Sequence, residues 1–232
     1  MKKHSFYTEL SYVVGLVMIA LSVALVKSAN FGVSMIVAPA YLLNQFIEPH
    51  FSAFTFGMAE YCFQGFLILV VIAVLRKFRL SYLFSFVTAV LYGFILDGFI
   101  FLVSFIPNGE MWQRIILFIV GQQLCTAGVA LMFRTYISPE SYELLVMEIS
   151  KGFKLNMSRF KWAYDIMSCL IAIAMSFIFF GKWRLDAIGV GTLICAATNG
   201  PIIGLYSKFY GKLFIFKDAL PFRKFFTGEE RI

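Results

Sequence analysis

The sequence has few charged residues. Only 14% of its 232 residues are Asp, Glu, Lys or Arg, whereas 60% are hydrophobic. A soluble domain is about a quarter charged and about half apolar, so this composition excludes an ordinary soluble protein. The apolar runs recur along the whole length, which predicts an integral membrane protein with a single membrane domain over residues 1–232.

Residues that commonly carry chemistry are also scarce. The chain has two histidines, and its four cysteines lie singly in apolar runs without a CxxC pair. It has no phosphate-binding loop, nucleophile–base pattern or nucleic-acid motif. We therefore expect no enzyme activity, no metal site, no cofactor and no nucleic-acid partner. The net charge of +7 is explained by basic residues that flank apolar runs and set membrane orientation.

Two short segments interrupt the apolar runs, Gly32–Ile47 and Arg134–Gly152. The first contains Pro39, which we expect to break it, and in the second Ser138 and Pro139 predict an N-cap followed by a first-turn proline. About 14 residues then remain before Gly152, roughly 21 Å of helix, which is too short for a hydrocarbon core of about 30 Å. Matched short segments in two halves of a membrane protein are typical of a transport site.

Six runs are long enough to span a bilayer. The first is interpreted as a retained helix, because no small-residue cleavage pattern typical of a signal peptide follows it. The six predicted spans cover residues 7–27, 54–75, 82–106, 113–133, 159–180 and 186–207.

The distribution of Lys and Arg favours six spans over eight. With six spans, 16 of the 20 basic residues lie on the side of both termini and 4 on the other, whereas eight spans give 13 against 7. Basic residues accumulate in cytoplasmic loops. We therefore predict a multi-pass protein of the inner or plasma membrane with both termini cytoplasmic.

The chain also repeats itself weakly. Residues 23–25, Val-Ala-Leu, recur at 129–131, and the Lys-aromatic-Arg-Leu motif at 77–80 recurs at 182–185. Three spans per unit is an odd number, so the second unit enters the membrane from the opposite side. The predicted fold is an all-α polytopic protein with six transmembrane helices and two short re-entrant or interfacial helices, in two inverted repeats of about 8–106 and 113–207.

Ionisable or polar residues within spans are candidates for solute binding. Asp97 lies well inside the third predicted span and is the best candidate for a coupling or solute-contacting group; the structural alternative is a hydrogen bond to Gln122 or Gln123. Asn199 precedes Pro201 in the last span, where it would line a cavity or belong to a packing kink.

The second short segment is acidic. Helical periodicity places Glu140, Glu143 and Glu148 on one face, opposite Tyr142 and its apolar neighbours. We favour an interfacial helix with this face in water; the alternative is a re-entrant helix whose Glu140 and Glu143 attract a cationic or zwitterionic solute at a cytoplasmic vestibule.

Glu60 and Asp165 lie at the repeat offset, each about two turns into its span. They are expected near the two mouths of a central cavity or, alternatively, at the headgroups or paired with Arg159 or Lys161. Asn30 and the polar residues of the first short segment offer neutral hydrogen bonding. The tail, 208–232, mixes phenylalanine with basic residues and predicts a cytoplasmic interfacial segment on lipid.

The chain resembles the YczE/YyaS/YitT-type bacterial membrane proteins. The residues that carry the resemblance are Gly15, Val23–Leu25 and Asn30–Gly32 near the start, and Gly189–Thr192 and Gly200–Gly204 near the end. The resemblance implies an inner-membrane protein of an uncharacterised family suspected of small-molecule transport, and it supplies no catalytic residues.

These observations predict a transporter of a small polar or zwitterionic solute that works by alternating access. Without an ATPase motif, transport would be facilitated, ion-coupled or driven by a separate energising subunit, and a homo-oligomer is compatible with the sequence. The alternatives are a substrate-binding membrane component of a larger importer and a non-transporting scaffold.

Overall fold

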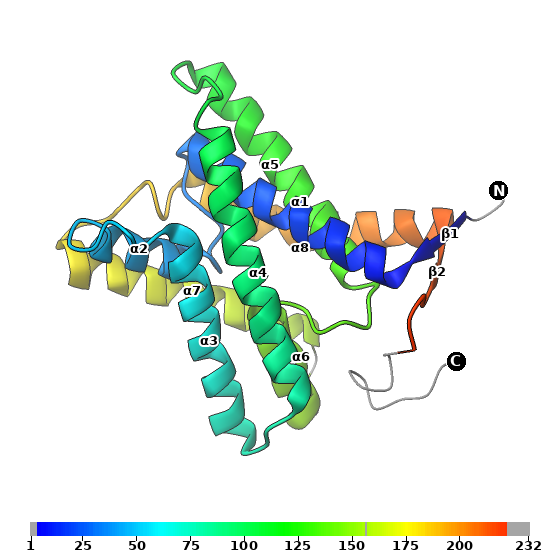
Figure 1. The fold of residues 1–232 in the computed structure, drawn as a ribbon. Helices are drawn as coiled ribbons and strands as arrows, with labels where there is room; N and C mark the ends of the chain where they lie inside the picture. The colour runs from blue at the N-terminus through cyan, green and yellow to red at the C-terminus, as the bar shows by residue number, and fades with distance from the viewer. Residues whose placement is uncertain (1–3, 156, 222–232) are drawn as a thin grey trace.

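The structure, a computed structural model, describes residues 4–155 and 157–221 (Figure 1). Within these ranges the chain forms eight helices and one pair of short strands. The elements are β1 (His4–Tyr7), α1 (Thr8–Ala29), α2 (Ala38–Ile47), α3 (Phe56–Leu75), α4 (Leu80–Val103), α5 (Met111–Met132), α6 (Ser141–Gly152), α7 (Met157–Phe180), α8 (Val190–Leu213) and β2 (Phe214–Lys217).

The six long helices confirm the six predicted spans. They contain 20 to 24 residues and are apolar enough to cross a membrane. At about 1.5 Å per residue, each reaches the roughly 30 Å that a hydrocarbon core requires. The last span is displaced from its predicted position: α8 begins at Val190, after a turn, and continues to Leu213.

The two short segments are helices, as predicted. With 10 and 12 residues, α2 and α6 extend about 15 and 18 Å, roughly half of the hydrocarbon core. Pro39 does not break α2. It lies in the first turn, where a proline fits because the backbone N–H groups there have no partner within the helix.

The centre of the molecule is the antiparallel crossing of α1 and α5. A Cβ atom added to Gly15 would lie 3.0 Å from the carbonyl oxygen of Gly128, and one added to Gly121 would lie 3.0 Å from the carbonyl oxygen of Ser22. These small residues therefore permit close backbone contact at two levels. The early part of each helix meets the late part of the other.

This direction bears on the topology of the short helices. If α2 crossed the membrane, three crossings (α2, α3 and α4) would lie between α1 and α5, and the two helices would run parallel. The antiparallel packing agrees instead with an α2 that does not cross. Gly15 and Gly121 are 106 residues apart, and so are Ser22 and Gly128, so the two close contacts are equivalent under the predicted repeat.

The remaining helices follow the same correspondence in part. α4 packs on α1 as α8 packs on α5, and α6 packs on α3 as α2 packs on α7. However, α3 also packs closely along α4, whereas among the described residues α7 has no comparable contact with α8 (Figure 1). The inverted repeat stays a prediction, and most of these helix pairs are those that it requires.

The segment after α8 forms a structure that the sequence analysis missed. β2 pairs in parallel with β1, in a register that joins His4 to Phe214 and Tyr7 to Lys217. The carboxylate of Glu9 accepts hydrogen bonds from the backbone N–H groups of Ala219 and Leu220. The tail predicted to lie on lipid therefore begins as the end of α8 and a strand. Its residues 222–232 lie outside the described part of the chain.

A cysteine-accessibility experiment tests the topology. In a background without native cysteines, we expect Lys77→Cys, between α3 and α4, to resist a membrane-impermeant maleimide in intact cells. Gly109→Cys, between α4 and α5, should react, because one crossing separates these exposed loops and positive charge favours a cytoplasmic Lys77 loop. Labelling of Lys77→Cys from outside, with Gly109→Cys protected, would contradict the predicted orientation.

Candidate functional site

The segment before α6 is held extended by hydroxyl groups of α4. The Ser85 hydroxyl donates to the carbonyl of Pro139, and the Thr88 hydroxyl donates to the carbonyl of Ser138 over 3.4 Å. The prediction that the helix starts at Ser138 and Pro139 is therefore wrong. Because their carbonyls are bound to α4, α6 begins at Ser141 with Glu140 at the N-cap position.

Glu140 does not cap its own helix. Its carboxyl group accepts a hydrogen bond from Gln64 Nε2 of α3 over 3.3 Å, and the Ser141 backbone N–H donates to Gln64 Oε1 over 3.1 Å. The amide of Gln64 thus takes the position at the helix N-terminus that a capping carboxylate would occupy. Glu140, Ser141 and Gln64 are all buried.

Glu60 lies one helical turn before Gln64 on α3 and is fully buried. Its Oε2 accepts a hydrogen bond from the Tyr142 hydroxyl over 3.0 Å, and the Gln64 side chain lies beside it on the same face of α3. The second oxygens of Glu60 and Glu140, and the hydroxyl of Ser141, have no hydrogen-bond partner in the described structure. Buried polar atoms are nearly always paired, so three unpaired atoms in one place make this region the candidate site.

Two further acidic residues complete what we call the acidic cluster: Glu60, Glu140, Glu143 and Asp165. Asp165 of α7 forms an ion pair with Lys161 over 3.4 Å, and both interact electrostatically with Glu143. Pairing of Asp165 with a nearby basic residue, the alternative to a place at the mouth of a cavity, is therefore observed. The side chain of Arg159, the other expected partner, lies outside the described residues.

The cluster corrects two expectations. Glu60 and Asp165 were predicted near opposite mouths of the molecule, but both lie against α6, because α6 packs between α3 and α7. The acidic face of α6 is not in water: Glu140 and Glu148 are buried, and Glu148 binds Arg79 over 3.1 Å and the Tyr82 hydroxyl over 2.8 Å.

Burial changes the ionisation of the α6 residues. Loss of hydration raises the pKa of Glu140 well above its ordinary value of 4.5, and the neighbouring Glu143 and Glu60 raise it further. Burial also raises the pKa of Glu143, against the opposing effect of Lys161. Both carboxyl groups at the start of α6 are therefore harder to ionise than a carboxyl group in water.

Several residues of this site were not predicted. Gln64 could have been found, because it follows Glu60 by four residues and shares its helix face. Tyr12, Tyr92 and Tyr164 could not, because helices far apart in sequence bring them into electrostatic contact with the cluster. The Tyr12 hydroxyl also lies 2.7 Å from the Thr88 hydroxyl.

Asp97 lies apart from the acidic cluster. Its carboxylate accepts hydrogen bonds from the Thr55 hydroxyl over 2.5 Å and from the Gly57 N–H over 2.8 Å, at the N-terminus of α3. Gly57 and Gly93 allow this approach of α3 to α4. The predicted structural alternative, a hydrogen bond from Asp97 to Gln122 or Gln123, is therefore wrong. Asp97 also lies closer to a helix end than predicted, six residues before Val103.

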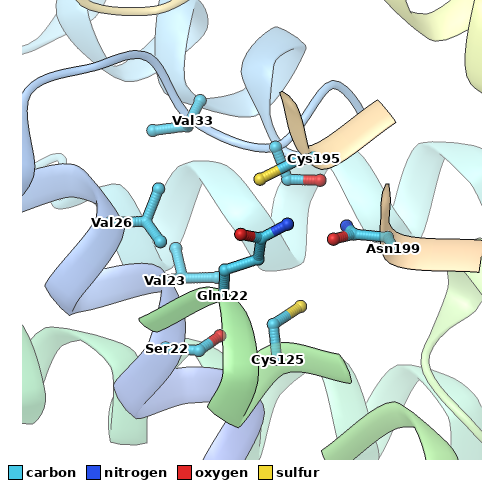
Figure 2. A pocket seen from close by; sticks show the side chains of 9 residues that line it. Ser22, Val23, Val26, Val33, Gln122, Cys125, Cys195 and Asn199 are labelled. Carbon is cyan, nitrogen blue, oxygen red and sulfur yellow. The ribbon is translucent and has the colours of Figure 1, made fainter. Parts of the chain in front are cut away.

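Asn199 lines a small cavity between α1, α5, α8 and the segment before α2. The cavity measures about 20 Å³, enough for roughly one water molecule. Figure 2 shows the side chains of Gln122 and Asn199 pointing toward this space, with Cys125 and Cys195 beside them. Gln122 donates to the Thr198 hydroxyl, and Asn199 Oδ1 is buried without a hydrogen-bond partner.

Cys125 lines the cavity and also interacts electrostatically with Glu140 and Glu143, but no residue of the acidic cluster lines it. Asn30 belongs to neither site. It is an exposed C-cap in the left-handed conformation, with φ of 55°, and its carbonyl accepts from Arg114 over 2.9 Å.

The fold and this site define a polytopic helical membrane protein with a buried acidic cluster beside a short, non-spanning helix. The chain belongs to a family of unknown function, DUF6198, which matches residues 6–208. No curated protein and no solved structure matches the chain. The resemblance to YczE/YyaS/YitT-type proteins stays a prediction.

A substitution at Asp97 tests its role in holding α3. We expect Asp97→Ala to lower stability by about 1–2 kcal/mol, because the first turn of α3 loses a charged hydrogen-bond acceptor. Thermal unfolding in detergent measures the change. Asp97→Asn keeps one acceptor oxygen and should lose less. A melting temperature unchanged in Asp97→Ala would contradict the structural role.

Proposed function

We propose that the protein is a membrane transporter for a small polar solute that carries a positive charge, either a cation or a zwitterion. The observation that carries the proposal is the acidic cluster: Glu60 and Glu140 are buried together within a bundle of span-length helices, each with an unpaired oxygen. Ionisable groups at such positions cost several kcal/mol and mark solute or ion pathways.

The position of the cluster supports transport. It surrounds the N-terminus of α6, one of two short helices that lie after the first span of each half. In many transporters, interrupted helices of this kind bring polar groups to a central binding site. The paired contacts of α1 and α5 support two inverted halves that could rock against one another around this point.

The two halves offer unlike walls to a solute. On the α2 side, Ser34 lines the cavity. The Asn44 side chain donates a hydrogen bond to the Phe54 carbonyl, and the Gln45 side chain donates one to Asp186, so both are occupied within the protein. On the α6 side, the acidic cluster supplies negative charge. A solute with an ammonium group and a neutral polar part matches this pair of surfaces.

The size of the cavity implies movement. Its volume of about 20 Å³ is far below the roughly 300 Å³ or more of a typical small-molecule site. Binding therefore requires the elements that line the cavity to separate: α8 and the segment before α2 must move away from α1 and α5. Such opening is what alternating access requires.

Transport is tested in two stages. A thermal-shift screen of the purified protein against amines, amino acids and vitamins identifies a solute, and uptake of that solute is then measured in proteoliposomes. We expect Glu140→Gln and Glu60→Gln to reduce uptake at least about tenfold, because losing a buried charge partner costs about 2 kcal/mol or more.

Glu48→Gln is the matched control, because Glu48 is an exposed acid at the end of α2 and its loss should leave uptake unchanged. Binding without uptake by the isolated protein would favour a component of a larger importer. Neither binding nor uptake would favour a scaffold and overturn the proposal.

A further inference from the structure

We infer that the neighbouring side chains of Glu60, Gln64 and Glu140 form a proton-binding site, which couples the proposed transport to movement of protons. In the packed state the two carboxyl groups hold protons. When α6 separates from α3, water reaches the carboxyl groups, and their O–H bonds break to release the protons to that water. This inference rests on the proposed function for its consequence, but the proton site itself does not require transport.

The first argument is connectivity. Gln64 Nε2 donates to Glu140 over 3.3 Å, Gln64 follows Glu60 by one helical turn on α3, and the Tyr142 hydroxyl donates to Glu60 over 3.0 Å. The two acids thus lie close enough to interact electrostatically, with Gln64 beside both, and each keeps one oxygen without a partner. A buried carboxylate that is ionised needs hydrogen-bond donors at both of its oxygens. Protonation removes the negative charge, so an oxygen without a donor then costs less free energy.

The second argument is the lack of a compensating cation. Among the described side chains, no Lys or Arg forms an ion pair with Glu60 or Glu140, and Lys161 is paired with Asp165. The α6 N-terminus does not compensate either, because the Ser141 N–H donates to Gln64 and not to Glu140. Burial of uncompensated charge is avoided by protonation.

The third argument is space. Glu60 and Gln64 have 0% of their surface exposed, so no water-sized void adjoins them. Among the residues that the structure describes, no three of the His, Cys, Asp and Glu side chains converge in a manner that would hold a metal ion. A proton is the one cation that needs no room beyond the carboxyl group itself.

The surroundings contain other groups that titrate or carry charge. The groups that face the site from the packed helices are Tyr142 and Glu143 on α6, Tyr92 on α4, Tyr12 on α1, Cys125 on α5, and Lys161, Tyr164 and Asp165 on α7. The acids among them make the local charge more negative. The raised pKa of Glu140 has this cause in addition to burial.

Infrared difference spectroscopy of the purified protein tests the site without any solute. A protonated carboxyl group has a C=O band that an ionised carboxylate lacks. At pH 7 we expect this band in the wild type, and we expect Glu60→Gln and Glu140→Gln each to remove part of it. Glu148→Gln is the matched control, because this buried acid of α6 is paired with Arg79 and should not contribute to the band. A band that is absent from the wild type, or unchanged in both variants, would overturn the inference.

Stability against pH provides a second measurement. Glu140 binds its proton more tightly in the folded than in the unfolded protein, so its contribution to stability is complete below pH 4.5 and is lost as pH rises toward the folded pKa. Glutamine resembles the protonated acid, so Glu140→Gln should fold and should show a smaller fall of melting temperature between pH 5 and pH 9. An equal fall in the variant and the wild type would contradict the assignment of Glu140.

Uptake with and without an imposed pH gradient separates this inference from the proposed function. Uptake that responds to the gradient in the wild type is the expected result. Uptake that is indifferent to the gradient would leave a transporter but overturn proton coupling. The infrared band without any uptake would leave the proton site and overturn transport.

Discussion

The close antiparallel crossing of α1 and α5 organises the rest of this protein. In a membrane, the hydrophobic effect does not drive helices together, so association depends on packing and on hydrogen bonds. Small residues at two levels of the crossing bring the backbones into contact, and α4 and α8 then pack on opposite members of the pair. The segments before α2 and α6 occupy the spaces that remain.

Those segments satisfy their backbone groups in equivalent ways. The carbonyl of Val33 accepts the Thr192 hydroxyl over 2.6 Å, and the carbonyl of Pro139 accepts the Ser85 hydroxyl. Val33 and Pro139 are 106 residues apart, close to the separation of their donors. Irregular backbone persists inside a membrane protein only where such partners exist. Hydroxyl groups on α4 and α8 therefore decide where the short helices begin.

The same packing places an acidic side chain at the start of only one of the two short helices. Position 140 is glutamate and its counterpart, 34, is serine, so only the second half brings an acid to the start of its short helix. Glu60 lies near that acid because α6 packs on α3. The proposed site is thus an asymmetry within a nearly symmetric set of contacts, because the second half supplies an acid where the first half supplies a serine.

Much of the site could not be anticipated from local patterns. Helical periodicity identified the acidic face of α6, but it could not tell whether this face is exposed to water or buried in the protein. Packing of α3, α4 and α7 against α6 determines that it is buried. Asp97 looked isolated because its partners, Thr55 and Gly57, lie on another helix. The strand pairing of β1 with β2 joins segments more than 200 residues apart, for which periodicity carries no signal.

The sequence by itself determined the membrane class, the six spans and the two short helices, because these depend on the length and composition of contiguous segments. The tertiary structure alone decided which polar residues meet. Glu60 and Gln64 lie on α3 whereas Glu140 lies at the start of α6. A contact between elements depends on how helices cross, which no single segment encodes.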